Sequence, residues 1–238
     1  MSIQHLAKKI DHTPPTSKII HNALPQNPSV GEYSINEERA NTLSHGLGVL
    51  GGIAALFFSL HKGYHSLTTL QLSGVILYCV SIILLFLCST LYHNATSQYW
   101  KRQFKIADHC AIYILIAGTY TPLMLISLAG TKADLILLVI WLVALGGVFF
   151  KTLFTGRFKV LSVCLYLGMG WLSMIIINDL IAGMSPLGFD LFIAGGLFYT
   201  LGVIFYVVKA IPFNHAIWHL FVLAGASSHF LCIYLTVI

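Results

Sequence analysis

The chain has 238 residues, of which 57% are hydrophobic and 9% are charged, and its mean hydropathy is +0.83. Soluble domains carry about a quarter charged residues, so this composition excludes a soluble globular domain and indicates an integral membrane protein. The formal net charge of +5 does not indicate nucleic-acid binding, because the thirteen Lys and Arg residues are spread along the chain rather than clustered.

The first part of the chain, residues 1–33, is polar, contains four prolines and has no apolar run. A cleavable signal peptide needs an apolar segment near the N-terminus, so none is expected, and we interpret residues 1–33 as a mobile cytoplasmic tail. Ser34 and Glu37 then have the spacing of a capping box, which predicts a short juxtamembrane helix at 34–44. We expect residues 34–238 to form the membrane domain.

Seven apolar segments follow, each near the length of a transmembrane helix of about 20 residues. Their approximate bounds are 44–61, 70–92, 106–128, 135–154, 160–181, 187–208 and 213–237. An all-α bundle of seven transmembrane helices is therefore predicted. All five cysteines fall inside these segments without a CxxC pair, so we expect core thiols rather than a disulfide or a thiolate metal site.

The basic residues predict how the bundle is oriented. Eleven of the thirteen fall in the N-terminal segment or in the loops on the same side of the membrane, and only Lys62 and Lys132 fall on the other side. Cytoplasmic loops carry an excess of Lys and Arg. We therefore expect the N-terminus in the cytoplasm and the C-terminus outside.

Several ionisable residues then fall at the cytoplasmic rim. His215 and His219, at the start of the last span, are four residues apart and share one helix face. The other ionisable residues at span ends on this side are His45, His93, Asp108 and His109. Three neutral imidazoles and a water make an open zinc site, in which the metal lowers the pKa of that water.

Two further residues suit such a site. Ser89 precedes His93 by four residues and shares its helix face, so its hydroxyl could bond the water or a substrate. Asp108 is the one carboxylate predicted at the inner end of a span, and Glu37 and Glu38 join it just before the first span. Asp108 could accept a proton or orient a ligand imidazole.

Each residue also has a simpler interpretation. The histidine pair and His45 could be solvated at the interface, Ser89 could bond the backbone of its own helix, and Asp108 could cap the start of its helix. Their convergence at one depth favours a metal site, because ionisable groups inside spans are functional candidates.

Motifs at these positions resemble the hemolysin III family, the bacterial branch of the progestin and adipoQ receptor superfamily. They are Glu38-Arg-Ala-Asn41-Thr-Leu-Ser44-His45, Ser89-Thr-Leu-Tyr-His93, Asp108-His109-Cys-Ala-Ile-Tyr, Ala117-Gly-Thr-Tyr-Thr-Pro122 and His215-Ala-Ile-Trp-His219-Leu-Phe-Val-Leu. The resemblance covers residues 34–238. It implies a seven-span bundle with zinc held near the cytoplasmic face by His93, His215 and His219, with Ser89 and Asp108 around the zinc-bound water.

The resemblance supports the site more firmly than any substrate. Eukaryotic receptor members are thought to hydrolyse lipid amides, as ceramidases do, and bacterial members are linked to membrane lipid homeostasis. The leading hypothesis is a zinc-dependent hydrolase of lipid amides or esters in the bacterial inner membrane, with a membrane lipid or fatty acid as substrate or ligand. In it Asp108 moves the proton and Ser89 holds the water or the oxyanion.

Two other functions stay open. The first is a non-enzymatic lipid sensor or receptor in which zinc is structural. The second is a pore-forming cytolysin, as the family name suggests. The spans show no stripe of charged or amide side chains that would line a water-filled channel, which argues against the pore.

Overall fold

The computed structural model describes residues 33–128, 130–154 and 157–238. The tail expected at residues 1–33 lies outside the described residues except for Tyr33. The described ranges are helical and contain no strand. Seven of the helices are long and apolar enough to cross a membrane, which confirms the predicted seven-span all-α bundle.

The elements follow the chain in a simple order. They are α1 (Ile35–Gly63), α2 (Thr69–Asn94), α3 (Gln98–Pro122), a π-helical turn η1 (Leu123–Ser127), α4 (Thr131–Phe154), α5 (Lys159–Gly170), a 3-10 segment η2 (Trp171–Ile176), α6 (Ile177–Gly183), α7 (Pro186–Val207), α8 (Asn214–Cys232) and a π-helical turn η3 (Ile233–Val237). The fifth span is built from α5, η2 and α6 together.

The first span differs from its expected start. Helix α1 runs from Ile35 without a break, so the segment at 34–44 and the first span are one helix. The capping box at its start is present, because Ser34 Oγ accepts from the Glu37 amide at 3.3 Å and Glu37 Oε2 accepts from the Ser34 amide at 2.9 Å. Helix α3 likewise begins before its apolar part. A hydropathy pattern marks only the length inside the hydrocarbon, so it misses polar turns that project beyond it.

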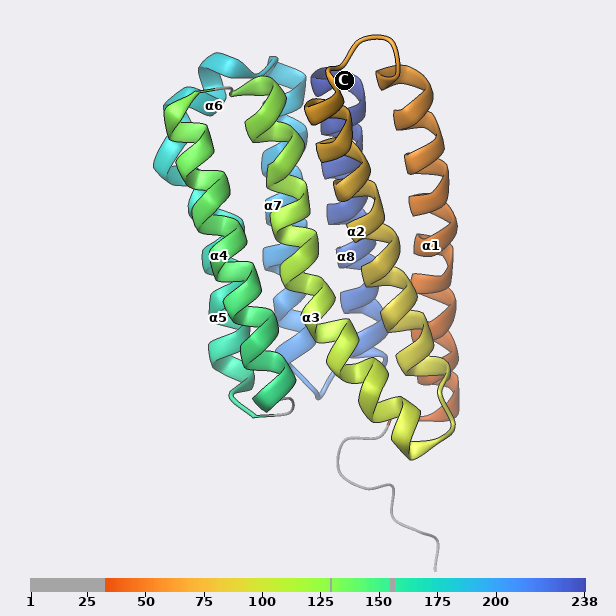
Figure 1. Cartoon of the computed structure of the whole chain (residues 1–238). Helices are drawn as coiled ribbons and strands as arrows, with labels where there is room; N and C mark the ends of the chain where they lie inside the picture. The colour runs from red at the N-terminus through yellow and green to blue at the C-terminus, as the bar shows by residue number, and fades with distance from the viewer. Residues whose placement is uncertain (1–32, 129, 155–156) are drawn as a thin grey trace, which may run out of the picture. The chain divides into compact units, whose positions relative to one another are not determined.

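Helix α1 lies between α2 and α8, and α8 lies between α1 and α7 (Figure 1). On the other side of α2, α3 packs against α2 and α4. The start of α1, the end of α2 and the start of α8 therefore meet at the lower end of the bundle in Figure 1. This is the end that the basic residues predict to be cytoplasmic.

Small residues allow the first two spans to pack closely. A Cβ atom on Gly48 of α1 would lie 2.6 Å from the Phe86 ring of α2, and one on Gly52 would lie 2.9 Å from Ile83. Lipid is as apolar as a leucine side chain, so helices in a membrane associate through such close packing rather than through the hydrophobic effect. The two glycines serve a contact inside this chain.

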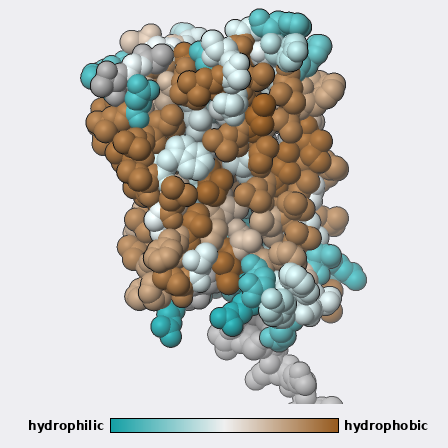
Figure 2. Space-filling view, viewed as in Figure 1, coloured by the Kyte–Doolittle hydropathy of each residue, from teal (hydrophilic) through white to brown (hydrophobic). Residues whose placement is uncertain are grey.

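The outer surface suits a lipid environment. Figure 2 shows an apolar surface over the middle of the spans, with hydrophilic residues at the two ends. On α1, Leu43, Leu47 and Phe57 are all more than two-thirds exposed. Exposed apolar side chains of this extent are stable when they face acyl chains.

Candidate metal centre

The structure brings together the three histidines proposed as metal ligands. His93 lies in the last turn of α2, and His215 and His219 lie in the first two turns of α8. One ring nitrogen from each lies within 4.8 Å of the others, and all three side chains are buried. His93 Nε2 and His215 Nε2 are 3.2 Å apart. Three imidazoles at this separation could hold one metal ion.

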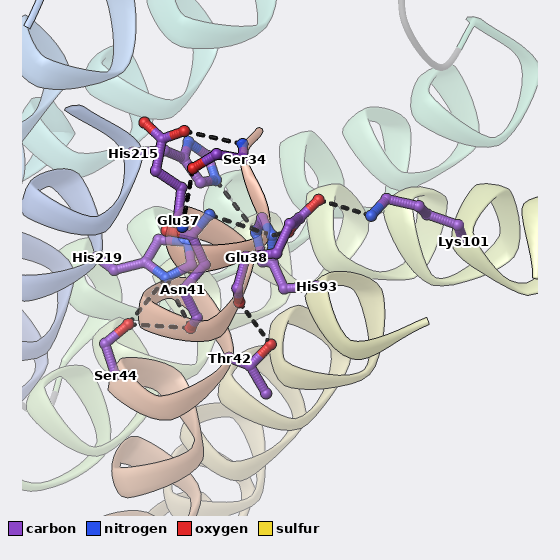
Figure 3. A network of polar contacts seen from close by, with 10 residues as sticks. All are labelled: Ser34, Glu37, Glu38, Asn41, Thr42, Ser44, His93, Lys101, His215 and His219. Atoms are coloured by element: carbon purple, nitrogen blue, oxygen red, sulfur yellow. Dashed lines mark hydrogen bonds and ion pairs between the residues drawn. The ribbon is translucent and has the colours of Figure 1, made fainter. Parts of the chain in front are cut away.

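A carboxylate from α1 sets the hydrogen position on His93. Glu38 Oε2 lies 2.6 Å from His93 Nδ1, and Glu38 Oε1 accepts from Lys101 Nζ at 2.6 Å (Figure 3). An ionised carboxylate only accepts hydrogen bonds, so His93 Nδ1 carries the hydrogen. The Nε2 atom of neutral His93 is then a free donor atom for a metal, in the arrangement found for many histidine ligands.

The same helix sets the hydrogen position on His219. Its Nδ1 atom lies 3.2 Å from the Asn41 carbonyl oxygen and 3.2 Å from Ser44 Oγ. The Ser44 hydroxyl donates to that carbonyl at 3.0 Å, so its oxygen is available as an acceptor. Both neighbours accept, so Nδ1 carries the hydrogen. His219 Nε2 is then an electron-pair donor that is buried without a hydrogen-bond partner.

No position of the hydrogen on His215 gives every ring nitrogen of the cluster a hydrogen-bond partner. If its hydrogen is on Nε2, it donates to His93 Nε2 and leaves its own Nδ1 and His219 Nε2 unpaired. If its hydrogen is on Nδ1, two nitrogen lone pairs face each other at 3.2 Å. A buried unpaired polar atom costs about 1–3 kcal/mol. A cation between the three Nε2 atoms removes the conflict, so these residues fit a metal ion.

Ser89 and Asp108 lie next to each other but outside the histidine cluster. Ser89 is fully buried on α2, one turn before His93. Asp108 of α3 is 5% exposed, and its carboxyl lies next to the Ser89 hydroxyl, which has no hydrogen bond of normal geometry. Asp108 is not among the groups whose ligand atoms lie within 4.8 Å of one another. Asp108 is therefore not one of the clustered ligand groups, and its predicted role stays a prediction.

A fourth histidine belongs to the same region. The ring of His45 stacks on that of His219, with centroids 3.5 Å apart and an interplanar angle of 7°. His45 is 1% exposed and both of its ring nitrogens lack a hydrogen-bond partner. The interfacial position considered for His45 is therefore wrong, because the long α1 helix carries it into the bundle between α2 and α8.

The supporting residues on α1 were not assigned from the sequence. Glu38, Asn41 and His45 are separated by three and four residues, so they form a stripe on one face of a helix. Polar residues at this spacing in a spanning helix are the signal that could have found them. The lysine partner of Glu38, Lys101, lies 63 residues away in the chain and gives no such signal.

Comparison with known proteins decides the family. The model of the family described as haemolysin-III related matches residues 33–230. The chain belongs to this family. It is 45% identical over 201 residues to the hemolysin-3 homolog of Bacillus subtilis, covering 84% of this chain and 94% of that protein. It is 43% identical over 200 residues to hemolysin-3 of Bacillus cereus, with coverages of 84% and 91%.

A more distant relative is human. The chain is 30% identical over 220 residues to the monocyte to macrophage differentiation factor of Homo sapiens, covering 87% of this chain and 88% of that protein. The family resemblance read from the motifs is thus confirmed, including its link to the receptor superfamily. This hemolysin III family member is a multi-pass membrane protein with three buried histidines that could form a metal site.

Proposed function

We propose that the histidine centre holds zinc and that the protein hydrolyses an amide or ester bond of a membrane lipid. The observation that carries the proposal is the set of converging imidazole nitrogens, two of them fixed as electron-pair donors by groups on α1. Three imidazoles with no carboxylate among them suit zinc and leave a fourth position open.

Zinc, when bound, supplies a Lewis acid and a nucleophile at neutral pH. The chain supplies the proton transfers. A carboxylate oxygen of Asp108 accepts the proton of the attacking water and returns it to the leaving nitrogen or oxygen. The adjacent Ser89 Oγ donates a hydrogen bond to the lipid carbonyl oxygen.

An aromatic ring shields the centre from water, and the position of the centre in the membrane favours a lipid ligand. Tyr33 stacks on His215 with ring centroids 4.7 Å apart and covers the centre on the side where α1 begins. We place the centre at the cytoplasmic face of the bacterial inner membrane, following the distribution of basic residues. A membrane lipid or a fatty acid is the ligand that this position favours.

Metal analysis and lipid turnover of the purified full-length protein test the proposal. Wild type should hold roughly one zinc per chain, and His219→Ala should lose most of it. Asp108→Asn should keep the zinc but release fatty acid from amide or ester lipids at least about a hundredfold more slowly. Asp179→Asn removes a carboxylate at the other end of the bundle and should change neither quantity. Full turnover by Asp108→Asn would contradict the mechanism.

One observation favours a second function. The three histidines join α2 to α8, and Glu38 and Asn41 join both helices to α1. A zinc ion at this junction would also suit a lipid sensor or receptor in which the metal is structural. Stoichiometric zinc without turnover of any amide or ester lipid would select the sensor. Pore formation stays an alternative from the sequence analysis, and no contact among the described residues favours it.

A further inference from the structure

Aromatic rings and a lysine lie over His215 of the histidine centre. Tyr33 stacks on His215, and the Tyr206 ring centroid lies 6.2 Å from that of His215. The Lys209 ammonium lies 5.8 Å from the Tyr33 centroid and 5.3 Å from the Tyr206 centroid. Lys209 therefore lies over the two tyrosine rings that cover the histidine.

A second group of aromatic and basic side chains lies at His93. Tyr92 packs against His93 with centroids 4.5 Å apart. The Lys101 and Lys105 ammonium groups lie 5.6 Å and 5.7 Å from the Tyr92 centroid. Lys101 is neutralised by Glu38, whereas Lys105 forms no ion pair within the described part of the chain.

The two groups are close enough to act on each other. Partial loss of hydration lowers the pKa of Lys209, and the ammonium groups of Lys159 and Lys105 lower it further. Burial also raises the pKa of Tyr33, with the neighbouring hydroxyls of Tyr92 and Tyr206 adding to the effect. Basic groups of α3, α5 and the link before α8 are thus near enough to interact, and tyrosines of α2 and α7 lie beside them.

Membrane topology does not account for this arrangement. The positive-inside rule concerns how many Lys and Arg residues a loop carries, and any position in the loop satisfies it. Three ammonium groups from three separate segments repel one another when they lie near one another. An anion bound between them converts this repulsion into attraction.

We propose that this lysine–tyrosine collar binds the phosphate of an anionic phospholipid headgroup. The collar consists of Lys105, Lys159, Lys209, Tyr33, Tyr92 and Tyr206. Lysine ammonium groups act as point charges toward phosphate, and tyrosine hydroxyls donate to its oxygens. Basic pockets between transmembrane helices at the cytoplasmic side are suited to such headgroups.

Apolar residues beside the collar select a lipid over a soluble anion. Val207 is 61% exposed, Val208 40% and Phe213 43%, and these residues flank Lys209 in the chain. Phosphate at Lys209 would place the acyl chains of the same molecule along this apolar surface. The headgroup site does not require that the histidine centre be hydrolytic, so the two proposals fail separately.

Native mass spectrometry of the full-length protein in detergent tests the collar. Phosphatidylglycerol and phosphatidylcholine are titrated separately, and the fraction of protein retaining one lipid gives each Kd. Wild type should bind phosphatidylglycerol more tightly. Each of Lys209→Gln, Lys159→Gln and Lys105→Gln should weaken it about fivefold, and the triple variant about a hundredfold.

Two controls separate the collar from general surface charge. Arg102→Gln removes a charge at the same end of the bundle, and Lys132→Gln removes one at the other end; both should leave the Kd within about twofold. Zinc content measured on the same samples shows whether the histidine centre is intact. If the triple variant does not fold, the single variants of the exposed residues Lys159 and Lys209 still test the proposal.

Three results would overturn the proposal. The first is equal affinity for phosphatidylcholine and phosphatidylglycerol. The second is a loss of affinity in Arg102→Gln as large as that in Lys209→Gln. The third is complete displacement of phosphatidylglycerol by millimolar inorganic phosphate, which would assign the collar to a soluble phosphate instead.

Discussion

Replacing Glu38 by glutamine should weaken metal binding without removing a ligand. The Glu38 carboxylate accepts a hydrogen bond from His93 Nδ1 at 2.6 Å, and the His93 side chain is fully buried. Glutamine keeps the length of the side chain and an acceptor oxygen but removes the negative charge. His93 Nε2 then becomes a weaker electron-pair donor, and its ring is held less firmly.

The size of the effect follows from the contact. A hydrogen bond to a charged group is about twice as strong as a neutral one, and removing such a partner of a histidine ligand weakens metal binding about 10–100-fold. This corresponds to about 1.4–2.7 kcal/mol. Lys101 acts one step further away, through an ion pair whose side chains are 31% and 17% exposed. Pairs of this exposure contribute about 0.2–1 kcal/mol, so Lys101→Gln should weaken binding by less than about fivefold.

Competition with a zinc chelator of known affinity measures these values on purified protein. The control is Asp179→Asn, which breaks the exposed 3.4 Å ion pair to Lys132 at the other end of the bundle and should not change the Kd. An unchanged Kd in Glu38→Gln would refute the proposed role of Glu38. A larger loss of zinc affinity in Lys101→Gln than in Glu38→Gln would refute the inference that Lys101 acts on His93 only through Glu38.

Two further predictions concern the stability of α1. Gly48→Ala should lower the free energy of unfolding by about 1–3 kcal/mol, because its Cβ would overlap the Phe86 ring. The control Gly51→Ala places a Cβ where nothing lies within 4 Å and should be neutral or stabilising by up to about 1 kcal/mol. Equal melting temperatures of the two variants in detergent would contradict this prediction. Ser34→Ala removes the helix cap and should destabilise the start of α1 by about 1 kcal/mol. Hydrogen exchange in its first turn should rise, and Thr42→Ala, whose hydroxyl bonds a carbonyl within the same helix, should leave that exchange unchanged.

The sequence carried enough information to predict the seven spans and the facing histidines. Hydropathy reports which length of helix lies in lipid, and the spacing of His215 and His219 places both on one helix face. The predicted topology places His93 at the same rim, and the family motif agrees with it as the third ligand. The placement of Glu38 beside His93 could not be predicted, because it depends on how α1 is rotated against α2. That rotation is set by close packing, such as Gly48 on Phe86, and no local pattern of residues encodes it.

The contacts of α1 make metal binding and helix packing interdependent. Glu38, Asn41 and Ser44 bond histidines of α2 and α8, so the ligand nitrogens are aligned only while α1 is packed between these helices. A ligand that binds only the folded protein stabilises it, by about 2.7 kcal/mol at a concentration of 100 Kd. Removing the metal with a chelator should therefore lower the melting temperature. The decrease should be smaller in Glu38→Gln, which has less metal affinity to lose, and absent in His219→Ala. A chelator effect of equal size in all three proteins would show that the metal acts elsewhere in the chain.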